Sequence, residues 1–467
     1  MKTFASVAVL LSALAGPAAA GEMPSGPESR TALAVTIYND GQALVKDSRR
    51  LDLAAGPNTI AFREVAARIR PETASLRSMG GAGFALVEQN FDFDLLTPDT
   101  LLRKYVGRQV TVIRTNPATG GESAERATVL ATNEGVVLRY PDRIETGAAG
   151  RLSFDSVPAS LRERPTLSVT VQAAKAGPQE AGLMYLTQGL GWKADYIATL
   201  DVDGKQMNLA GWVTLTNQSG TAYQGARLQL VAGTLNRVAE PRLAVAKAMA
   251  MPAPAPAREM REEKLFEYHL YTLDQPTTIL DNQVKQVALL SAGAIPVSRE
   301  YELQGAAWYY QGRYAEIGRK LKPSVFLSFE NKGGELGKPL PQGTVRVYSR
   351  DSRGGAQLVG EDAIGHTAKG EKLRLRLGEA FDITADRVQT DYRSLPGNAW
   401  QSSFRVEIRN ADPKPVTVRL VEPMPGDWKV TEQSHPHAKL SSGAAAWDVT
   451  VPGEGKAVLE YTTVARW

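Results

Sequence analysis

The stretch from Leu183 to Gly233 constrains the fold most, because it reads as one extended segment after another with a turn signal between each. Apolar side chains share one face of its first two segments, at Tyr196, Ala198 and Leu200 and then at Leu209, Val213 and Leu215. A period of two is typical of strands that bury one face. We therefore predict that consecutive β-strands form the centre of the protein.

Two turn signals separate these strands. Asp203-Gly204 can supply the positive φ angles of a two-residue hairpin, and Asn217 to Gly220 precedes a third strand at Ala226 to Val231.

Gly189 to Ala194 matches the dinucleotide fingerprint G-x-G-x-x-A, but that fingerprint requires a following helix, and Lys193 to Leu200 has strand periodicity. We predict that these glycines mark a bulge or a crossing point.

The same stretch resembles a known family. G-L-G-W-K-A-D-Y at 189–196, followed by N-Q-S-G and L-Q-L-V-A-G, is similar to the opening of the C-terminal domain of mucoidy inhibitor A, which defines a bacterial family of uncharacterised exported proteins. The resemblance resumes after about residue 265 and continues to Trp467, through LVGEDAIGH at 358–366, LRLRLGEAFD at 373–382 and the closing V-L-E-Y. It implies an exported β protein and brings no catalytic residues. Relatives of mucoidy inhibitor A carry a coiled coil before this domain, and this sequence has no sustained heptads.

The first 20 residues predict a secretory signal peptide. Lys2 gives a positive start, Phe4 to Ala15 is apolar, and Ala18-Ala19-Ala20 is a small-residue cleavage signal. We therefore expect an exported protein, periplasmic or extracellular, with no transmembrane span in its mature part, since no later apolar run is long enough. The chain contains no cysteine, so neither disulfides nor thiolate sites are available.

Charge indicates little about partners. The chain has 54 basic and 50 acidic side chains, spread along its length. A nucleic-acid-binding protein usually gathers its basic residues on one face, so we expect no nucleic-acid partner. Because we expect the protein to be exported, we expect its partner to be a protein or a glycan of the cell envelope.

The N-terminal region, 21–175, is predicted to be a β domain. Apolar runs alternate with turn clusters up to about residue 96, which predicts a small antiparallel sheet. Thr97-Pro98 is an N-cap signal for a short helix that ends at Gly107, and short, closely spaced strands follow. This order predicts a small SH3-like barrel around 97–157.

The C-terminal region, 176–467, is predicted to be one or more β-sandwiches. Leu373, Leu375 and Leu377 alternate with basic residues, and Phe404, Val406 and Ile408 alternate with charged ones, so each strand has one dry and one wet face. The Pro- and Ala-rich segment at 237–264 predicts a disordered excursion between two strands. The expected fold class is all-β.

Catalytic patterns are absent from the sequence. It has no G-x-S-x-G elbow and no H-E-x-x-H motif. His435 and His437 are weak metal candidates that need a third ligand such as His366 or Glu432. Asp92 and Asp94 lie on the same side of one predicted strand, where two carboxylates could share a proton or a cation, although they are more simply its solvent-exposed face. The Asp201-Val202-Asp203-Gly204 turn lacks the further acidic positions of a calcium loop. We predict no catalytic residues and no cofactor.

An aromatic cluster is the best binding candidate. Trp308, Tyr309, Tyr310 and Tyr314 lie close together in the sequence beside Arg313. Flat rings with polar edges stack on sugars and bind peptides. Tyrosines of a core beside an edge strand give the same pattern, and both interpretations stay open here.

The sequence thus predicts an exported cell-envelope β protein that acts by binding or by structural support. The alternative is an envelope hydrolase or metal-dependent enzyme that uses scattered carboxylates and the His435/His437 pair.

Overall fold

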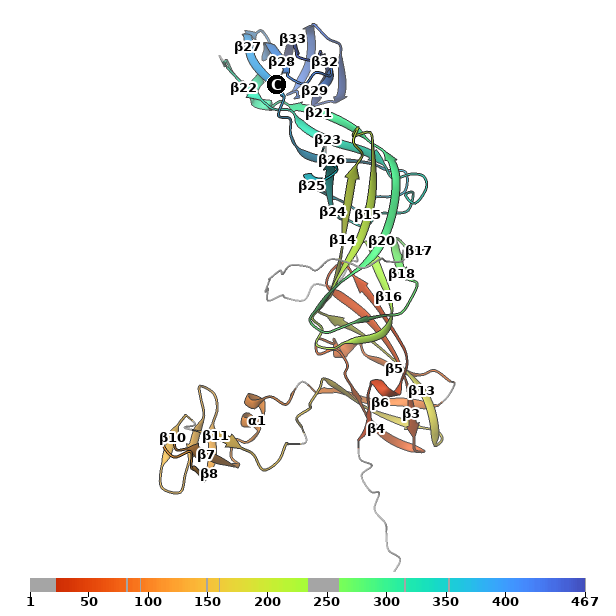
Figure 1. Cartoon of the computed structure of the whole chain (residues 1–467), viewed down its shortest axis with the longest axis vertical. Helices are drawn as coiled ribbons and strands as arrows, with labels where there is room; N and C mark the ends of the chain where they lie inside the picture. The colour runs from red at the N-terminus through yellow and green to blue at the C-terminus, as the bar shows by residue number, and fades with distance from the viewer. Residues whose placement is uncertain are drawn as a thin grey trace, which may run out of the picture. The chain divides into compact units, whose positions relative to one another are not determined.

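The computed structural model describes residues 22–80, 83–92, 94–147, 150–158, 160–233, 260–314, 316–351 and 353–466. Strand follows strand through these ranges, with one α-helix, α1 (Pro98–Lys104), and three short 3-10 helices: η1 (Pro27–Ser29), η2 (Pro71–Thr73) and η3 (Ala307–Tyr310) (Figure 1). The fold class is all-β, as predicted. None of the described helices is long and apolar enough to cross a membrane.

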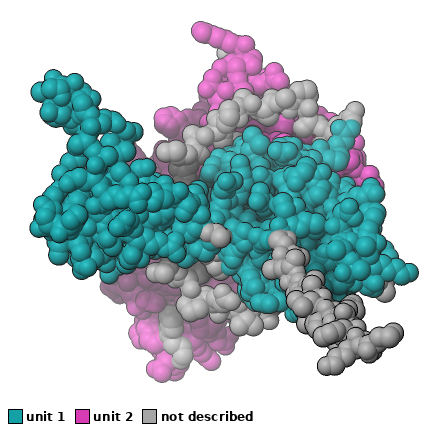
Figure 2. Space-filling model, turned by 90° about the horizontal axis from the view of Figure 1, so that it is seen from below, with its two compact units in different colours: residues 1–191, 216–230, 275–284 teal, residues 192–215, 231–274, 285–467 magenta. Residues whose placement is uncertain are grey.

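The chain forms two compact units and passes between them more than once (Figure 2). Unit 1 contains the described residues up to 191 together with 216–230 and 275–284, and unit 2 contains 192–215, 231–274 and the chain from 285 onward. These units are not the ranges 21–175 and 176–467, whose standing as folding domains stays a prediction.

Unit 1 contains two larger sheets. The first has the order β1 (Met23–Ser25), β4 (Gly56–Arg63), β12 (Thr166–Ala173), β6 (Phe84–Asp92). The second has the order β16 (Tyr223–Ala232), β2 (Arg30–Tyr38), β3 (Gln42–Leu53), β13 (Gly177–Gln188), β5 (Ser75–Ser78), and β19 (Thr277–Ile279) also pairs with β16.

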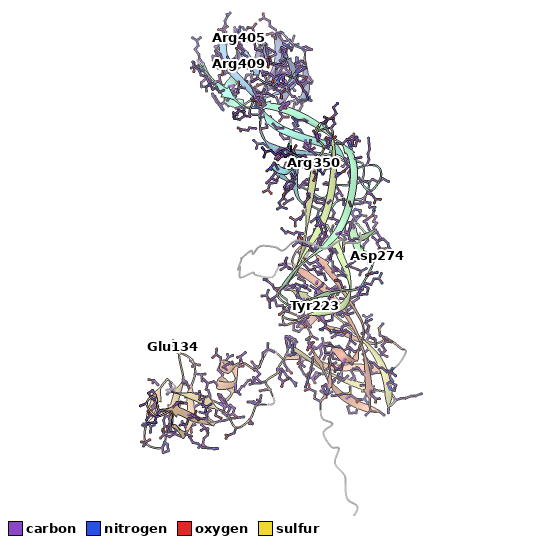
Figure 3. The ribbon with its side chains drawn as sticks, in the orientation of Figure 1. Glu134, Tyr223, Asp274, Arg350, Arg405 and Arg409 are labelled. Atoms are coloured by element: carbon purple, nitrogen blue, oxygen red, sulfur yellow. The ribbon has the colours of Figure 1, made fainter. Side chains whose placement is uncertain are left out.

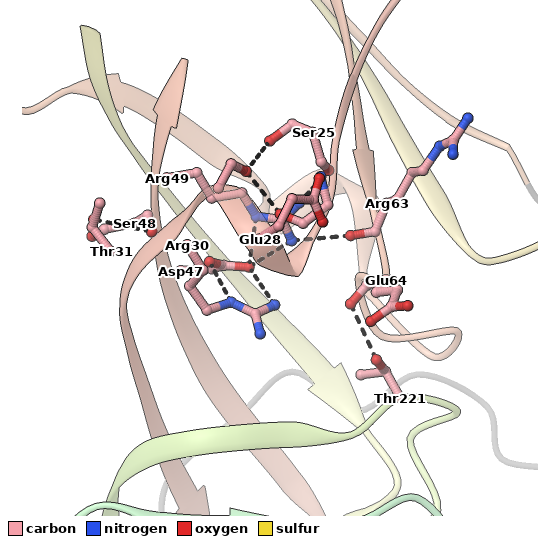
Figure 4. A network of polar contacts seen from close by, with 12 residues as sticks. Ser25, Glu28, Arg30, Thr31, Asp47, Ser48, Arg49, Arg63, Glu64 and Thr221 are labelled. Carbon is pink, nitrogen blue, oxygen red and sulfur yellow. Dashed lines mark hydrogen bonds and ion pairs between the residues drawn. The ribbon is translucent and has the colours of Figure 1, made fainter. Parts of the chain in front are cut away.

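A buried ion pair links these two sheets. Arg49 on β3 lies 2.7 Å from the carboxylate of Asp47, and its guanidinium also donates to the carbonyl oxygens of Ser25 on β1 and Arg63 on β4 (Figure 4). Arg30 donates to the second oxygen of Asp47. Because each charge has a partner, this interior polar group is satisfied.

A third, smaller sheet follows α1 in unit 1. Its order is β10 (Ile144–Thr146), β9 (Val137–Arg139), β8 (Glu122–Ala131), β7 (Gln109–Thr115), β11 (Arg151–Ser153). Thr97 caps α1 by accepting from Thr100 N, as the sequence predicts, but the helix ends at Lys104, with Tyr105 as its C-cap, and Gly107 with its φ of 82° lies in the turn that follows. The described strands have two free edges in this order, so the SH3-like barrel is not confirmed.

Unit 2 contains three sheets and one hairpin. The first sheet has the order β20 (Gln283–Pro296), β15 (Gln206–Asn217), β14 (Leu190–Leu200), β24 (Gly343–Arg350), β25 (Ala356–Ile364). The second has the order β26 (Lys372–Glu379), β23 (Ser324–Glu330), β21 (Ser298–Gln304), β29 (Val416–Pro423), β32 (Ala444–Val451), β31 (His437–Ser441). The third has the order β22 (Gly318–Leu321), β27 (Ile383–Leu395), β28 (Ala399–Asn410), β33 (Gly455–Arg466), β30 (Asp427–Gln433).

The hairpin consists of β17 (Met260–Leu265) and β18 (Tyr268–Leu273). The sequence placed 260–264 in the disordered excursion, and this part of the prediction is wrong, because those residues pair with β18. Residues 237–259 of the predicted excursion lie outside the described residues.

The second and third sheets of unit 2 share one core, which is the predicted sandwich packing. Buried residues from both sheets contact one another, among them Phe404, Val406 and Ile408 from β28 and Val418 and Leu420 from β29. The opposite face of β28 is wet, and Arg405 and Arg409 on it pair with Glu460 and Asp386 (Figure 3). The predicted dry and wet faces of this strand are confirmed.

The wet face of β26 carries a similar charge network. Lys372 and Arg374 both contact the carboxylate of Glu300 on β21. Burial alone would raise the pKa of Glu300, but Ser328 and these two cations together lower it to about 2.

Gly189 is a crossing point, which is one of the two roles that the sequence predicts for it. It stands between the last residue of β13 and the first of β14, and those strands belong to different sheets. Its φ is 87°, and a Cβ there would lie 2.6 Å from the carbonyl oxygen of Gln218. Gly189 accepts a hydrogen bond from Gln218 N, so only a residue without a side chain fits this approach.

The turn at Asp203-Gly204 differs from the prediction. β14 ends at Leu200 and β15 begins at Gln206, so the loop is longer than two residues. Gly204 alone of the dipeptide has a positive φ, and the side chain of Asp201 accepts from Lys205 N and Gln206 N. The carboxylate of Asp201 shapes this loop, which explains its place there without a calcium ion.

A buried asparagine organises each of three turns. Asn410 ends β28, donates to the carbonyl oxygens of Lys414 and Pro452, and accepts from Asp412 N. Asn217 and Asn331 are equally buried, and each donates to two backbone carbonyls and accepts from a backbone N–H. Each side chain thereby satisfies backbone groups that the turn leaves without a sheet partner.

Candidate functional site

The predicted aromatic cluster lies in the connection between β21 and β22 of unit 2. Its residues divide into two groups. Tyr309 and Tyr310 on η3 are buried in the sandwich core, which is the core arrangement that the sequence left open. Trp308 is 43% exposed, Tyr314 is half-buried and Arg313 is exposed, and we call these three the Trp308 surface.

The indole of Trp308 is held by two other rings. Its ring centroid lies 4.6 Å from that of Tyr309 at 77° and 5.0 Å from that of Tyr314 at 82°. Both are edge-to-face arrangements, which aromatic pairs prefer. The exposed part of the indole is therefore presented in one orientation.

Gln389 on β27 fixes the loop beneath these rings. Its side-chain amide donates to the carbonyl oxygens of Tyr309 and Gly312, and its carbonyl accepts from Tyr314 N. Arg313 adds a fourth tie by donating to the carbonyl oxygen of Tyr392. The loop is thus attached to a strand of the sandwich rather than only to its own ends.

A buried ion pair lies below Tyr309. Arg387 on β27 and Glu422 on β29 are both fully buried, with Nη1 and Oε1 2.6 Å apart. Within the described residues, Arg387 Nε and Nη2 find no acceptor, but the guanidinium carbon lies 4.7 Å from the ring centroid of Tyr309, as in a cation–π contact. Burial raises the pKa of Glu422, and Arg387 opposes that shift.

Two tyrosines complete the buried group. Tyr310 donates to Oε2 of Glu422, and the hydroxyls of Tyr310 and Tyr461 lie 3.2 Å apart. Burial raises the pKa of both phenols well above the ordinary value, so they stay protonated. A Cβ at Gly305 would collide with Glu422 Oε2, which explains the glycine at the start of the loop.

This arrangement suits binding rather than bond breaking. An exposed, oriented indole with a tyrosine and an arginine beside it offers stacking and charge-assisted hydrogen bonds to a planar or ring-shaped ligand. The buried phenols and carboxyl lie below the surface and support the loop, and their proton affinities do not favour nucleophilic attack.

The weak metal candidates are not brought into a metal site. His435 Nδ1 lies 2.9 Å from Ser434 Oγ, and His437 Nδ1 lies 2.8 Å from Gln433 Oε1. The ring of His437 also packs against Trp428 and Trp447. No group of three or more His, Asp or Glu side chains suited to a metal ion occurs among the described residues, and neither His366 nor Glu432 joins the pair.

The acidic pair Asp92 and Asp94 does not share a proton or a cation. Asp92 accepts from Arg162 Nε at 2.7 Å, and Asp94 lies 2.5 Å from Lys104 Nζ. Each carboxylate has its own cation, so the functional interpretation of this pair is wrong.

Sequence reasoning missed the three residues that support the Trp308 surface. A signal was present, because Arg387 and Gln389 follow Ile383 and Ala385 at the inward positions of one strand. Glu422 likewise follows Val418 and Leu420 on the dry face of β29. A charged residue at a position of buried periodicity predicts an internal ion pair.

Comparison with known proteins gives one result. The chain has no match among the curated proteins. The family profile described as Domain of unknown function (DUF4139) matches residues 182–467, which contain β14 to β33, the Trp308 surface and the ion pair below it. Since this match covers more than half of the 467 residues, the chain belongs to the DUF4139 family.

Proposed function

We propose that the protein is an exported cell-envelope protein that binds a partner through the Trp308 surface and performs no catalysis there. The observation that carries this proposal is the fixed orientation of a half-exposed tryptophan. Trp308 contacts two tyrosine rings edge-to-face, and Gln389 ties the loop to β27. A surface ordered before binding loses little conformational entropy when the partner arrives.

The ligand class follows from the same side chains. Tryptophan and arginine are enriched among the residues that contribute most to binding, and aromatic faces stack on sugar rings. We therefore propose a protein or a glycan of the cell envelope as the partner. Among the described residues Arg313 donates one of its five N–H groups, to the carbonyl oxygen of Tyr392, so further donors are available to a ligand.

Export rests on the first 20 residues and on the family. A positive start, an apolar run and Ala18-Ala19-Ala20 form a signal-peptide pattern, and the absence of cysteine leaves no unpaired thiol for an oxidising compartment. The resemblance to mucoidy inhibitor A supports a bacterial protein of the periplasm or the exterior. N-terminal sequencing of the protein from fractionated cells tests this, with Gly21 as the expected first residue and an intact Met1 in the cytoplasm as the contrary result.

A crosslinked pull-down tests the binding surface. The full-length protein should capture a specific envelope partner, and Trp308→Ala should lose it. Phe266→Ala is the matched control, since Phe266 is an exposed aromatic of the same unit on the turn between β17 and β18. Capture of the same partner by Trp308→Ala would refute the Trp308 surface as the binding site.

Elemental analysis of the purified protein tests the alternative function, a metal-dependent hydrolase. A stoichiometric transition metal that is lost in the His435→Ala, His437→Ala double variant would replace the binding proposal with the enzyme.

A further inference from the structure

A cavity of about 290 Å³ lies in unit 2, apart from the Trp308 surface. Most of its lining comes from the ends of β14 and β26 and from the starts of β21, β23 and β27. Its lining includes Leu200, Arg299, Glu379, Phe381, Asp382 and Asp412. None of these residues belongs to the Trp308 surface or to its supports.

An irregularity in β26 accounts for the opening. The register between β23 and β26 shifts between Val325 and Phe326, and Gly378 has a φ of 148°. A bulge of this kind bends a strand and ends regular pairing. Several lining side chains, among them Leu200, Leu327 and Ile383, are buried and apolar, so the cavity has an apolar floor.

The rim carries charges of both signs. Arg299 lies at the side of the β14–β15 loop, because a Cβ at Gly204 would be 3.1 Å from its Nη2. Glu379, Asp382 and Asp412 come from the end of β26, the next loop and the turn after β28. Asp412 accepts from Lys414 N, yet none of these four side chains has an ion-pair partner among the described residues, unlike the paired charges on β26 and β28.

The mouth also exposes a large apolar ring. Phe381 is 83% exposed, and the ammonium of Lys322 lies 5.0 Å from its ring centroid. Val359, another lining residue, is partly exposed as well. Exposed apolar groups at a cavity with a few polar groups around it are typical of a ligand site.

We propose that this cavity binds a small zwitterion in which a primary ammonium and a carboxylate are joined by a short apolar stem. The ammonium lies toward Glu379, Asp382 and Asp412, the carboxylate lies toward Arg299, and the stem covers the apolar floor beside Phe381. The rim supplies an arginine as well as carboxylates, so a ligand with a single charge satisfies only one kind of group.

Ligand-observed NMR titration of the full-length protein tests this with 6-aminohexanoate as the probe. Hexylamine and hexanoate are the controls, since each keeps the stem and one charge. We expect 6-aminohexanoate to bind about fivefold more tightly than either control, the gain of one further exposed ion pair. Absence of binding by the probe, or equal binding by a singly charged control, would overturn the proposal.

Variants assign the two ends. Arg299→Gln should abolish the preference over hexylamine, and Glu379→Gln combined with Asp382→Asn should abolish the preference over hexanoate. Arg313→Gln is the matched control on the Trp308 surface and should leave all three affinities unchanged. If Arg313→Gln changed these affinities as much as Arg299→Gln does, the zwitterion would bind outside the cavity and the proposal would be overturned. Loss of the envelope partner in Trp308→Ala would refute the proposed function and leave this test unaffected.

Discussion

Replacing Arg387 with methionine is the sharpest perturbation of the Trp308 support. Arg387 and Glu422 are both fully buried, with Nη1 and Oε1 2.6 Å apart. Methionine is similar in length and can fill the space, so the main loss is the positive charge. Glu422 then stays in the core without a counter-charge.

The expected cost is about 3–5 kcal/mol at neutral pH, because removing one partner of a buried pair leaves an uncompensated charge. The cation–π contact with Tyr309 is lost in addition, with a contribution of about 0.5–2 kcal/mol. The surface pair of Arg405 and Glu460 gives the control: Arg405→Met removes an exposed charge and should cost less than about 1 kcal/mol.

The penalty should depend on pH with a defined sign. Burial already raises the pKa of Glu422 above its ordinary 4.5, and losing Arg387 raises it further. A carboxyl whose pKa is higher in the folded than in the unfolded state favours folding when protonated. The penalty of Arg387→Met should therefore be small below about pH 4.5 and grow as the pH rises through the folded-state pKa.

Hydrogen exchange on peptides of β28 and β33 is the suitable assay, because it measures the opening free energy of this sandwich separately from the rest of the chain. A second variant, Arg387→Met with Glu422→Leu, should recover most of the loss, since a hydrophobic replacement of a buried pair is often neutral. A loss in Arg387→Met no larger than in Arg405→Met, or one that does not vary with pH, would refute the reasoning.

Three further outcomes are expected. Asn410→Ala should lower the free energy of unfolding by about 2–4 kcal/mol in urea denaturation, because two donors and one acceptor of buried bonds are removed; a loss under about 0.5 kcal/mol would contradict this. Gly189→Ala should lower the melting temperature, since its Cβ would meet Gln218, whereas Gly191→Ala, with open space around it, should not. Glu300, with a folded pKa of about 2 against 4.5, contributes stability above pH 4.5 that is lost as the pH falls from 4.5 toward 2, so Glu300→Gln should flatten acid unfolding there.

Strand identity was readable from the sequence where one face is dry. The alternation at Lys372 to Leu377 and at Phe404 to Arg409 predicted strands that the structure extends to β26 and β28. The cap at Thr97 and the crossing point at Gly189 were also readable, because each depends on local backbone chemistry. For Tyr309 and Tyr310 the sequence allowed two interpretations, a binding surface or a core position, and the structure shows the core position.

Sheet membership was not readable, because it depends on contacts between distant segments. β14 pairs in parallel with β24, and β21 pairs in parallel with β29, although more than a hundred residues separate each pair along the chain. Period-two patterning fixes which face is buried and leaves the neighbour unspecified. The supports of the Trp308 surface were missed for the same reason, since Gln389 and Glu422 reach η3 from other strands.

The three buried asparagines show how one chain supplies neighbouring sheets in turn. β15, β23 and β28 lead through Asn217, Asn331 and Asn410 to β16, β24 and β29, and in each case the next strand belongs to a different sheet. A chain that leaves its ladder exposes carbonyls that no strand partner can satisfy. Asparagine suits this position because its short side-chain amide donates two hydrogen bonds and accepts one from nearby backbone groups, whereas an ionised aspartate cannot donate. The recurrence of the same contacts at three sheet changes indicates that these turns, rather than strand propensity, direct each strand to the next sheet.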